Sequence, residues 1–344
     1  MMRQCEKFNK IETYSQGDLG ALKLTVPGKS IFAVWEGEYI VPTLLPREYT
    51  EIEAIVEGAD PLQLAIVEEI ARSKYLNAFQ LHEWLMLRGF SISRPELTKR
   101  ICELKKYHVI KESVIRIPKA KKGLCYYELD VKGYHIALDR GVPFHKGNSY
   151  RSHATKVAQG MVETPSEVKR VLMANQIVLH MLVNKVKLEN FGIMETFLVR
   201  DENGLVNDDA IIRTAANICI DSNSVLAYEV VRDNEEAYTK LEHKMARYYT
   251  LLHNADYLAK NHHGHTAFPQ VVICGESLEH NKKIMRFLKS KDLWREEDPI
   301  LFTEDLLNIK DSAHSIYALD EKEECVWYSL PIREIKEEEE RVSA

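Results

Sequence analysis

Hydrophobic residues recur at intervals of three and four over three successive stretches of this chain, 62–70, 79–85 and 97–104. That spacing places them along one side of a helix, so each stretch predicts an amphipathic helix. Ser93 is suited to cap the third helix, and Pro95 to lie in its first turn. The sequence therefore predicts three short helices in a row.

Two strand-like runs follow, at 109–117 and 124–131, and the segment 118–123 between them contains three lysines. A short turn-rich connection between two such runs predicts a β-hairpin. Three helices followed by a basic hairpin are the elements of a winged helix-turn-helix. We expect this DNA-binding fold over residues 59–141, with the diagnostic pattern at 61–132.

Beyond residue 152 helical and strand-like patterns are mixed. Pro165 opens a long helix that reaches Val183, and a second helix spans roughly 235–252. The remaining elements are strand-like runs at 193–199, 210–212, 218–220, 225–231, 270–274, 300–302 and 326–330, with a helix at 278–288. The turn Asp221-Ser222-Asn223-Ser224 predicts a hairpin. This order predicts a compact α/β domain with a mixed sheet over residues 153–330.

The rest of the chain is less regular. Residues 1–58 predict a small β-containing extension, with strands at 22–26 and 31–41 and a loop leading into 51–56. The turn-rich segment 142–152 is interpreted as an interdomain linker, or alternatively as an ordinary loop. The glutamate-rich stretch 331–344 predicts a frayed acidic tail, with partner binding as the alternative.

Positive charge is concentrated on the predicted third helix and hairpin. Ten basic residues lie between positions 91 and 125: Arg94, Lys99, Arg100, Lys105, Lys106, Lys111, Arg116, Lys119, Lys121 and Lys122. Only Glu96, Glu103 and Glu112 oppose them, so this segment carries about +7 within a chain of formal net charge −6. A local basic concentration in an acidic protein indicates a polyanion site, although solvated lysines alone are the alternative.

If the segment binds duplex DNA, its residues have distinct expected roles. Arg94, Lys99 and Arg100 on the third helix are expected to lie nearest the bases in the major groove. Lys119, Lys121 and Lys122 on the wing are expected at phosphates or in the minor groove. The other residues of the expected DNA-binding set are Lys105, Lys106 and Arg116.

Composition excludes several classes of protein. The 344 residues, of which 45% are hydrophobic and 28% charged, suit two or three ordinary globular domains. The six cysteines form no CxxC pair, which favours thiols in a reducing cytoplasm over a disulfide framework or a zinc site. Since no apolar run of membrane-spanning length and no signal-peptide pattern is visible, we predict a cytoplasmic protein without a membrane partner.

Two carboxylates on neighbouring predicted strands are the main candidates for chemistry. Asp209 lies at the start of one hairpin strand and Glu229 within its partner, so the two can meet and bind a divalent metal such as Mg²⁺. Nucleases of the PD-(D/E)xK type add a lysine two residues after the second carboxylate, but Val231 occupies that position. Lys240 or Lys244 on the next helix is the alternative source of charge. The pattern therefore favours a degenerate, non-catalytic nuclease-like fold with no cofactor, and the alternatives are a working nuclease and an unrelated fold.

The other polar clusters are weaker candidates for a functional site. Lys240, Lys244 and Arg247 line one face of the helix 235–252, either as a phosphate-binding face or as partners of nearby glutamates. The cluster His262-His263-Gly264-His265 lacks further metal ligands at suitable spacing, so a solvated loop is expected there. The segment Ile273–Ser277 matches neither a phosphate-binding loop nor a serine-hydrolase motif.

Taken together, these landmarks resemble the replication-relaxation family of plasmid and integrative-element proteins. The similar features are the winged-helix stretch 61–132, the strand Asp209–Ile212, the strand glutamate Glu229, the helix segment Lys244–Tyr248, and the strand and helix between 269 and 288. The chain departs from the family pattern at Asp208, where a proline is usual, and at Val231, where an acidic residue is usual. The resemblance implies an N-terminal winged helix joined to a nuclease-like domain, and a DNA-binding role in replication, mobilisation or regulation of a mobile element.

The leading hypothesis is a sequence-specific, non-catalytic DNA-binding accessory protein of a mobile genetic element. Its expected partners are double-stranded DNA, a second copy of the chain in a homodimer, or other replication or relaxosome proteins. Two alternatives stay open. One is a metal-dependent endonuclease that uses Asp209 and Glu229 with Lys240 or Lys244. The other is a protein-interaction module whose winged helix binds protein.

Overall fold

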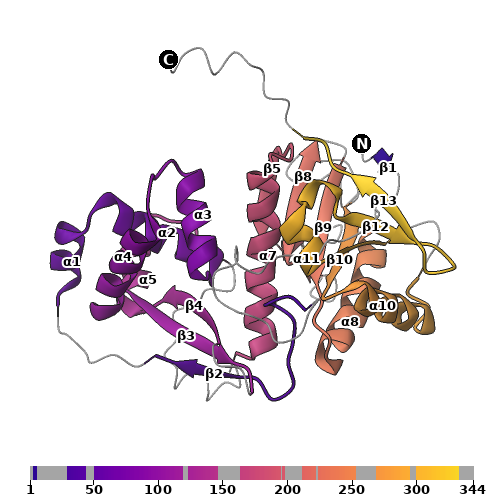
Figure 1. Ribbon diagram of the computed structural model, residues 1–344, viewed down its shortest axis with the longest axis horizontal. Coiled ribbons are helices and arrows are strands. Elements are labelled where there is room, and N and C mark those ends of the chain that lie inside the picture. Colours follow the sequence, from indigo (N-terminus) through magenta and orange to yellow (C-terminus); the bar gives the residue numbers. More distant parts are fainter. Residues whose placement is uncertain are drawn as a thin grey trace, which may run out of the picture.

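The protein is described by a computed structural model that covers residues 3–5, 29–43, 50–118, 123–145, 163–194, 196–197, 211–221, 224–252, 269–294 and 300–332. Helices and strands are mixed, as predicted, and form two lobes, with a long helix of the second lobe lying next to the first (Figure 1). We call residues 39–145 the N-terminal lobe and residues 163–332 the C-terminal lobe. No helix among the described residues combines the length and the apolar character needed to cross a bilayer.

The N-terminal lobe contains the three helices expected from the periodicity. Its helices are α1 (Ile52–Gly58), α2 (Pro61–Ser73), α3 (Ala78–Leu87), α4 (Arg94–Lys106) and α5 (Val131–Asp139). Local chemistry sets their starts, because Asp60 and Asn77 each form a capping box and the Ser93 hydroxyl accepts a hydrogen bond from the Glu96 amide. The buried stripe of α4 is Leu97, Ile101 and Leu104, as its spacing predicts.

A small antiparallel sheet completes this lobe, in the order β2 (Tyr39–Pro42), β3 (Ile110–Arg116) and β4 (Leu124–Leu129). The predicted hairpin is therefore present as β3 and β4. The strand predicted at 31–41 is wrong except for its end, because the chain turns at Gly37, which has a φ of +72°. Residues 44–49 of the predicted loop and the predicted strand at 22–26 lie outside the described residues, and the segment that the loop enters is the helix α1, which begins at Ile52.

The C-terminal lobe has more elements than the sequence predicts. Its helices are α7 (Pro165–Val183), α8 (Glu235–Leu252), α10 (Leu278–Ser290) and α11 (Asp305–Lys310), with one 3-10 turn at Ser312–His314. Its strands are β5 (Asn190–Ile193), β6 (Thr196–Phe197), β7 (Ile212–Arg213), β8 (Ala216–Asp221), β9 (Ser224–Val230), β10 (Gln270–Gly275), β11 (Leu301–Glu304), β12 (Ile316–Leu319) and β13 (Cys325–Ser329). The predicted hairpin is β8 with β9, whereas α11 and β12 were not predicted.

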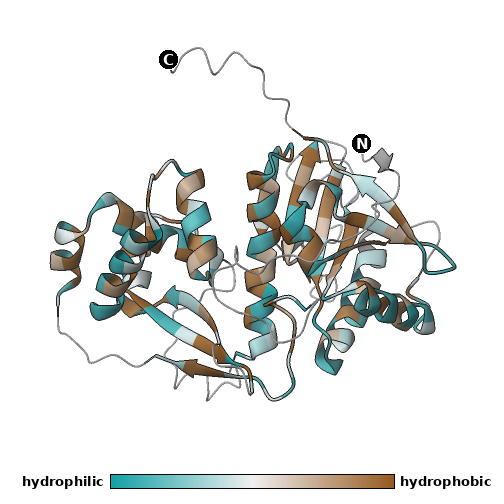
Figure 2. Cartoon of the chain, viewed as in Figure 1, coloured by the Kyte–Doolittle hydropathy of each residue, from teal (hydrophilic) through white to brown (hydrophobic). Residues whose placement is uncertain are grey.

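The large sheet has the strand order β1-β13-β12-β11-β10-β9-β8-β5, where β1 is Arg3–Cys5. Strands β9, β10 and β11 are parallel to one another, and the flanking pairs are antiparallel. Successive residues of β9 and β10 alternate between two apolar clusters, one shared with α7 and one shared with α8 and α10. The sheet is hydrophobic where the helices cover it (Figure 2). The mixed sheet is thus the middle of three layers.

Helix α7 joins the two lobes through buried amide side chains. Asn175 donates to the carbonyl oxygens of Ser73 and Tyr75 at 3.0 and 3.1 Å. Gln80 of α3 donates to the Leu172 carbonyl at 2.7 Å and to the Gln176 side chain at 3.0 Å. Because these groups are buried, losing either partner leaves an unsatisfied polar group, which favours a fixed arrangement of the lobes.

The start of the predicted linker is packed rather than extended. The His145 amide donates to the Ala71 carbonyl of α2 at 2.9 Å, and the His145 side chain is buried. Burial lowers the pKa of His145 to about 3, so the ring is neutral at physiological pH. Residues 146–152 of this segment, like residues 333–344 of the predicted tail, lie outside the described ranges.

Residues 29–38 cross the carboxyl ends of the parallel strands, and we call them the strap. Arg232, just after β9, and Asp305, just after β11, form a bidentate ion pair with N–O distances of 2.8 and 2.9 Å. The Ser30 hydroxyl donates to Asp305 at 2.6 Å, and Arg232 donates to the Phe32 carbonyl at 3.0 Å. Buried Lys169 of α7 also bonds to the strap through the Ala33 carbonyl. The N-terminal extension is therefore anchored in the C-terminal lobe before it enters β2.

Candidate functional site

The outward face of α4 carries Pro95, Lys99, Cys102 and Lys106, all exposed, at intervals of four, three and four residues. Arg94 is exposed at the first position of the helix, with its guanidinium 5.9 Å from the centre of the Phe79 ring. Lys99 has neither an ion pair nor a side-chain hydrogen bond to any described residue. This face is exposed and basic, and we call it the α4 face.

Other predicted DNA-binding residues are engaged within the protein. Arg100 pairs with Asp60 at 2.7 Å and with Glu103 at 3.1 Å, and Lys105 pairs with Glu112 at 2.7 Å. Arg100 therefore fastens α4 to the start of α2. The charge count from sequence was incomplete, because Asp60 lies outside the counted segment and approaches Arg100 only after folding.

The predicted wing is described in part. Arg116 is exposed at the end of β3. Lys119, Lys121 and Lys122 lie outside the described residues, as do Asp208, Asp209 and the histidine cluster at 262–265. The expected roles of these residues stay predictions.

Glu229 lies in the central strand β9 and is 2% exposed. Strand alternation places it between Ala227 and Val231 on the face covered by α8. Its carboxylate accepts hydrogen bonds from Lys244 on one oxygen and from the Tyr248 hydroxyl, at 2.9 Å, on the other. The structure thus brings together two of the four predicted catalytic residues.

Lys244 lies one helical turn before Tyr248 on α8. Its ammonium donates a hydrogen bond to Glu229 and another to the Arg213 carbonyl at 2.6 Å. Burial lowers the pKa of Lys244. The nearby charges of Arg170 and Arg213 also lower it, whereas Glu229 acts to raise it. Lys240 lies farther out and pairs with Glu236 at 2.7 Å and Glu167 at 3.3 Å. Lys244 is therefore the cation next to the strand carboxylate, and Lys240 is not.

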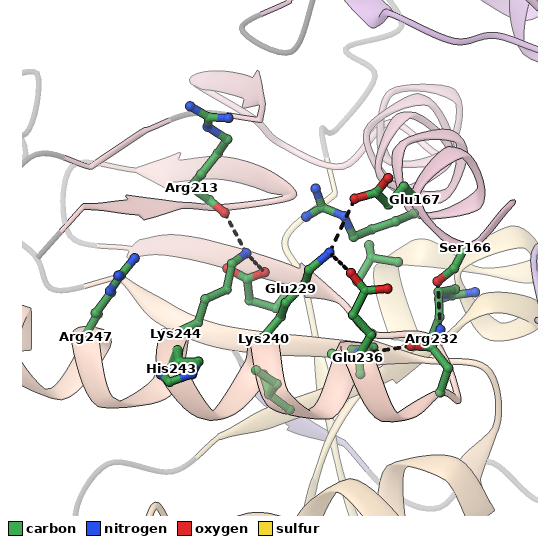
Figure 3. Close-up of a pocket in the computed structure, with 16 residues that line it drawn as sticks. Ser166, Glu167, Arg213, Glu229, Arg232, Glu236, Lys240, His243, Lys244 and Arg247 are labelled. Carbon is green, nitrogen blue, oxygen red and sulfur yellow. Dashed lines mark hydrogen bonds and ion pairs between the residues drawn. The ribbon is translucent and has the colours of Figure 1, made fainter. Parts of the chain in front are cut away.

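These residues line a pocket of about 460 Å³ between α7, α8 and the ends of β7 and β9 (Figure 3). Six cationic side chains and three carboxylates contribute to it: Arg170, Arg213, Arg232, Lys240, Lys244 and Arg247, with Glu167, Glu229 and Glu236. Its size is that of an ordinary small-ligand site. We call it the basic pocket.

Sequence reasoning did not identify Arg170 and Arg213. Arg170 lies on α7 beside the apolar positions that predict that helix, and Arg213 is the last residue of the two-residue strand β7, so neither belongs to a recognisable motif. Arg232 was also missed, although it directly follows the apolar run 225–231, where parallel strands present ligand-binding residues.

The described residues do not form a metal site. No group of three or more histidine, cysteine or acidic residues among them is placed to hold an ion. Both oxygens of Glu229 already accept hydrogen bonds from protein groups, which disfavours this carboxylate as a metal ligand. Glu229 is therefore better understood as the partner of Lys244 and Tyr248 than as a metal ligand.

Comparison with protein-family models, with curated proteins and with solved structures finds no match to this chain.

Proposed function

We propose that this protein is a sequence-specific duplex DNA-binding protein that reads the major groove with the α4 face. In this proposal α2, α3, α4 and the β3–β4 hairpin form a winged helix. The C-terminal lobe is a nuclease-like domain without catalytic activity. The protein then acts as an accessory factor in replication, mobilisation or transcription of a mobile genetic element, as the resemblance of its sequence implies.

The exposed α4 face is the observation that carries the proposal. Lys99 and Lys106 lie one above the other on the outward side, while Leu97, Ile101 and Leu104 hold the opposite side in the core. A helix held in this way can enter a groove without disturbing the domain that carries it. Cationic side chains at such a position can contact both phosphates and base edges.

Selection from a random pool of duplexes tests the proposal. The full chain is expected to enrich fragments that share one short motif, because base contacts discriminate by about 1–3 kcal/mol each. The Lys99→Ala variant should lose that enrichment, whereas Lys283→Ala on the outer face of α10 should keep it. If the unaltered protein enriches no common motif, sequence-specific binding is contradicted.

A second function is favoured by one contact, that between Lys244 and Glu229. A lysine beside a strand carboxylate is the arrangement that a PD-(D/E)xK-type nuclease needs, here with the lysine on the following helix. This contact supports the alternative of an endonuclease that uses Asp209, Glu229 and Lys244. The hydrogen bonds to both Glu229 oxygens argue against it, because they compete with metal coordination.

We expect the purified protein to leave plasmid and linear DNA uncut in the presence of Mg²⁺ or Mn²⁺. A phosphodiesterase of this type needs carboxylates that are available to a metal, and Glu229 is held by Lys244 and Tyr248. The measurement is product formation on gels over a time course. Cleavage that disappears in both Asp209→Ala and Glu229→Ala, with DNA binding retained, would instead establish the nuclease.

A further inference from the structure

The basic pocket contains more positive charge than its own carboxylates neutralise. Buried Asp305, which is not part of the lining, neutralises the charge of Arg232. The other lining residues are then five cations and three carboxylates. Lys244 is paired with Glu229, and Lys240 with Glu167 and Glu236. Two positive charges are therefore left over in a pocket whose walls are partly apolar.

The cations that these pairs leave over are Arg247, which donates to the Ile211 carbonyl at 3.0 Å, and Arg170 and Arg213. Within the described ranges, neither the Arg170 nor the Arg213 guanidinium makes an ion pair or a side-chain hydrogen bond. Burial lowers the pKa of Arg170, and the nearby charge of Arg213 lowers it further, whereas Glu229 and Glu167 act to raise it. Two guanidinium groups that repel each other across one pocket gain most from an anion placed between them.

The lining also limits the kind of anion. Among the described residues that line the pocket, His243 supplies the only ring and there is no phenylalanine, tyrosine or tryptophan, so charge rather than base stacking is the main attraction for a ligand. Planar guanidinium groups match the oxygens of phosphate and can bind them in pairs. A phosphate monoester carries a charge of about −1.5 to −2 at neutral pH, which matches the two unbalanced charges, whereas a backbone phosphodiester carries one.

We propose that the basic pocket binds a phosphate monoester, with Arg170 and Arg213 contacting its oxygens. The monoester belongs either to a free nucleotide or to the 5′ end of a DNA strand, and the chemistry recognised is the same in both. This site is separate from the α4 face and does not depend on duplex binding there.

Calorimetric titration of the full chain with inorganic phosphate and with adenosine monophosphate tests the site. Saturable binding is expected at pH 7.5, and weaker binding is expected at pH 5.5, since the second phosphate pKa is about 6. Arg170→Gln should weaken binding about tenfold or more, the usual loss for a hydrogen bond to a charged group. Arg213→Gln, at an exposed position, should weaken it similarly without affecting folding.

Arg286→Gln is the matched control, because it removes one arginine charge from the exposed face of α10. It should bind phosphate as the unaltered protein does, and all three variants should bind duplex DNA normally. Absence of saturable binding, or equal binding in Arg170→Gln, Arg213→Gln and Arg286→Gln, would overturn the proposal.

Oligonucleotides with a 5′-phosphate or a 5′-hydroxyl distinguish the two sources. Tighter binding of the phosphorylated strand, lost in Arg170→Gln, assigns the pocket to DNA ends. Equal binding of both strands, together with Arg170-dependent binding of adenosine monophosphate, assigns it to a free nucleotide. Either result supports the site.

Discussion

Replacing Arg94, Lys99 and Lys106 together with alanine is expected to weaken binding to a specific duplex by about a hundredfold or more. Contacts of this kind contribute about 1–3 kcal/mol each, and every 1.4 kcal/mol is a tenfold change in affinity. All three residues are exposed on α4, so the substitutions remove charge without opening the core. Affinity is measured by fluorescence anisotropy at fixed ionic strength.

The chain offers a control with the same change of charge. Lys283, Arg286 and Lys289 lie on the exposed face of α10 in the other lobe (Figure 1). Their triple alanine variant should bind the specific duplex nearly as well as the unaltered protein. Equal losses in the two triple variants would mean that net charge, and not the α4 face, determines binding.

Asp305→Ala is expected to destabilise the protein by about 3–5 kcal/mol, a large part of the stability of a typical domain. Asp305 is 0% and Arg232 1% exposed, so the substitution leaves a buried guanidinium without its counter-charge. It also removes the acceptor of the Ser30 hydroxyl and so loosens the strap. Although burial acts to lower the pKa of Arg232, Asp305 raises it above its ordinary value, which keeps the arginine charged. Chemical denaturation measures the change.

A second bidentate ion pair, at the surface, is the control. Arg286 and Glu323 also form two N–O contacts, at 2.7 and 2.5 Å, but at the surface. Glu323→Ala should therefore cost less than about 1 kcal/mol. The double variant Arg232→Met with Asp305→Leu should be more stable than Asp305→Ala, because no unpaired charge remains. A small effect of Asp305→Ala would mean that the strap is not held by this pair.

Local patterns in the sequence were sufficient for the elements that have strong periodicity and clear caps. The helices α2, α3 and α4 and the helix α8 were predicted close to their observed bounds. The strap was mistaken for a strand because its apolar residues, Ile31 to Ala33, are buried by contacts with a distant lobe. No local pattern distinguishes that kind of burial from burial in a sheet.

The candidate sites also combine features that local sequence predicts with features that depend on contacts between distant segments. Spacing on one helix identified the buried stripe of α4 and the cationic side of α8. The pairing of Arg100 with Asp60 and the approach of Arg170 to Arg213 depend on packing between separate elements. Charge counted along the chain therefore overestimates the charge available on α4 and misses the charge gathered in the basic pocket.

The salt dependence of duplex binding tests the central claim of DNA recognition by the α4 face most directly. Neutralising about four to six phosphates predicts a slope of roughly −4 to −5 in a plot of log affinity against log salt concentration. The Arg94, Lys99 and Lys106 triple variant should give a clearly shallower slope, and the α10 triple variant should not. An affinity that is independent of salt, or one slope shared by all three proteins, would contradict DNA recognition by the α4 face.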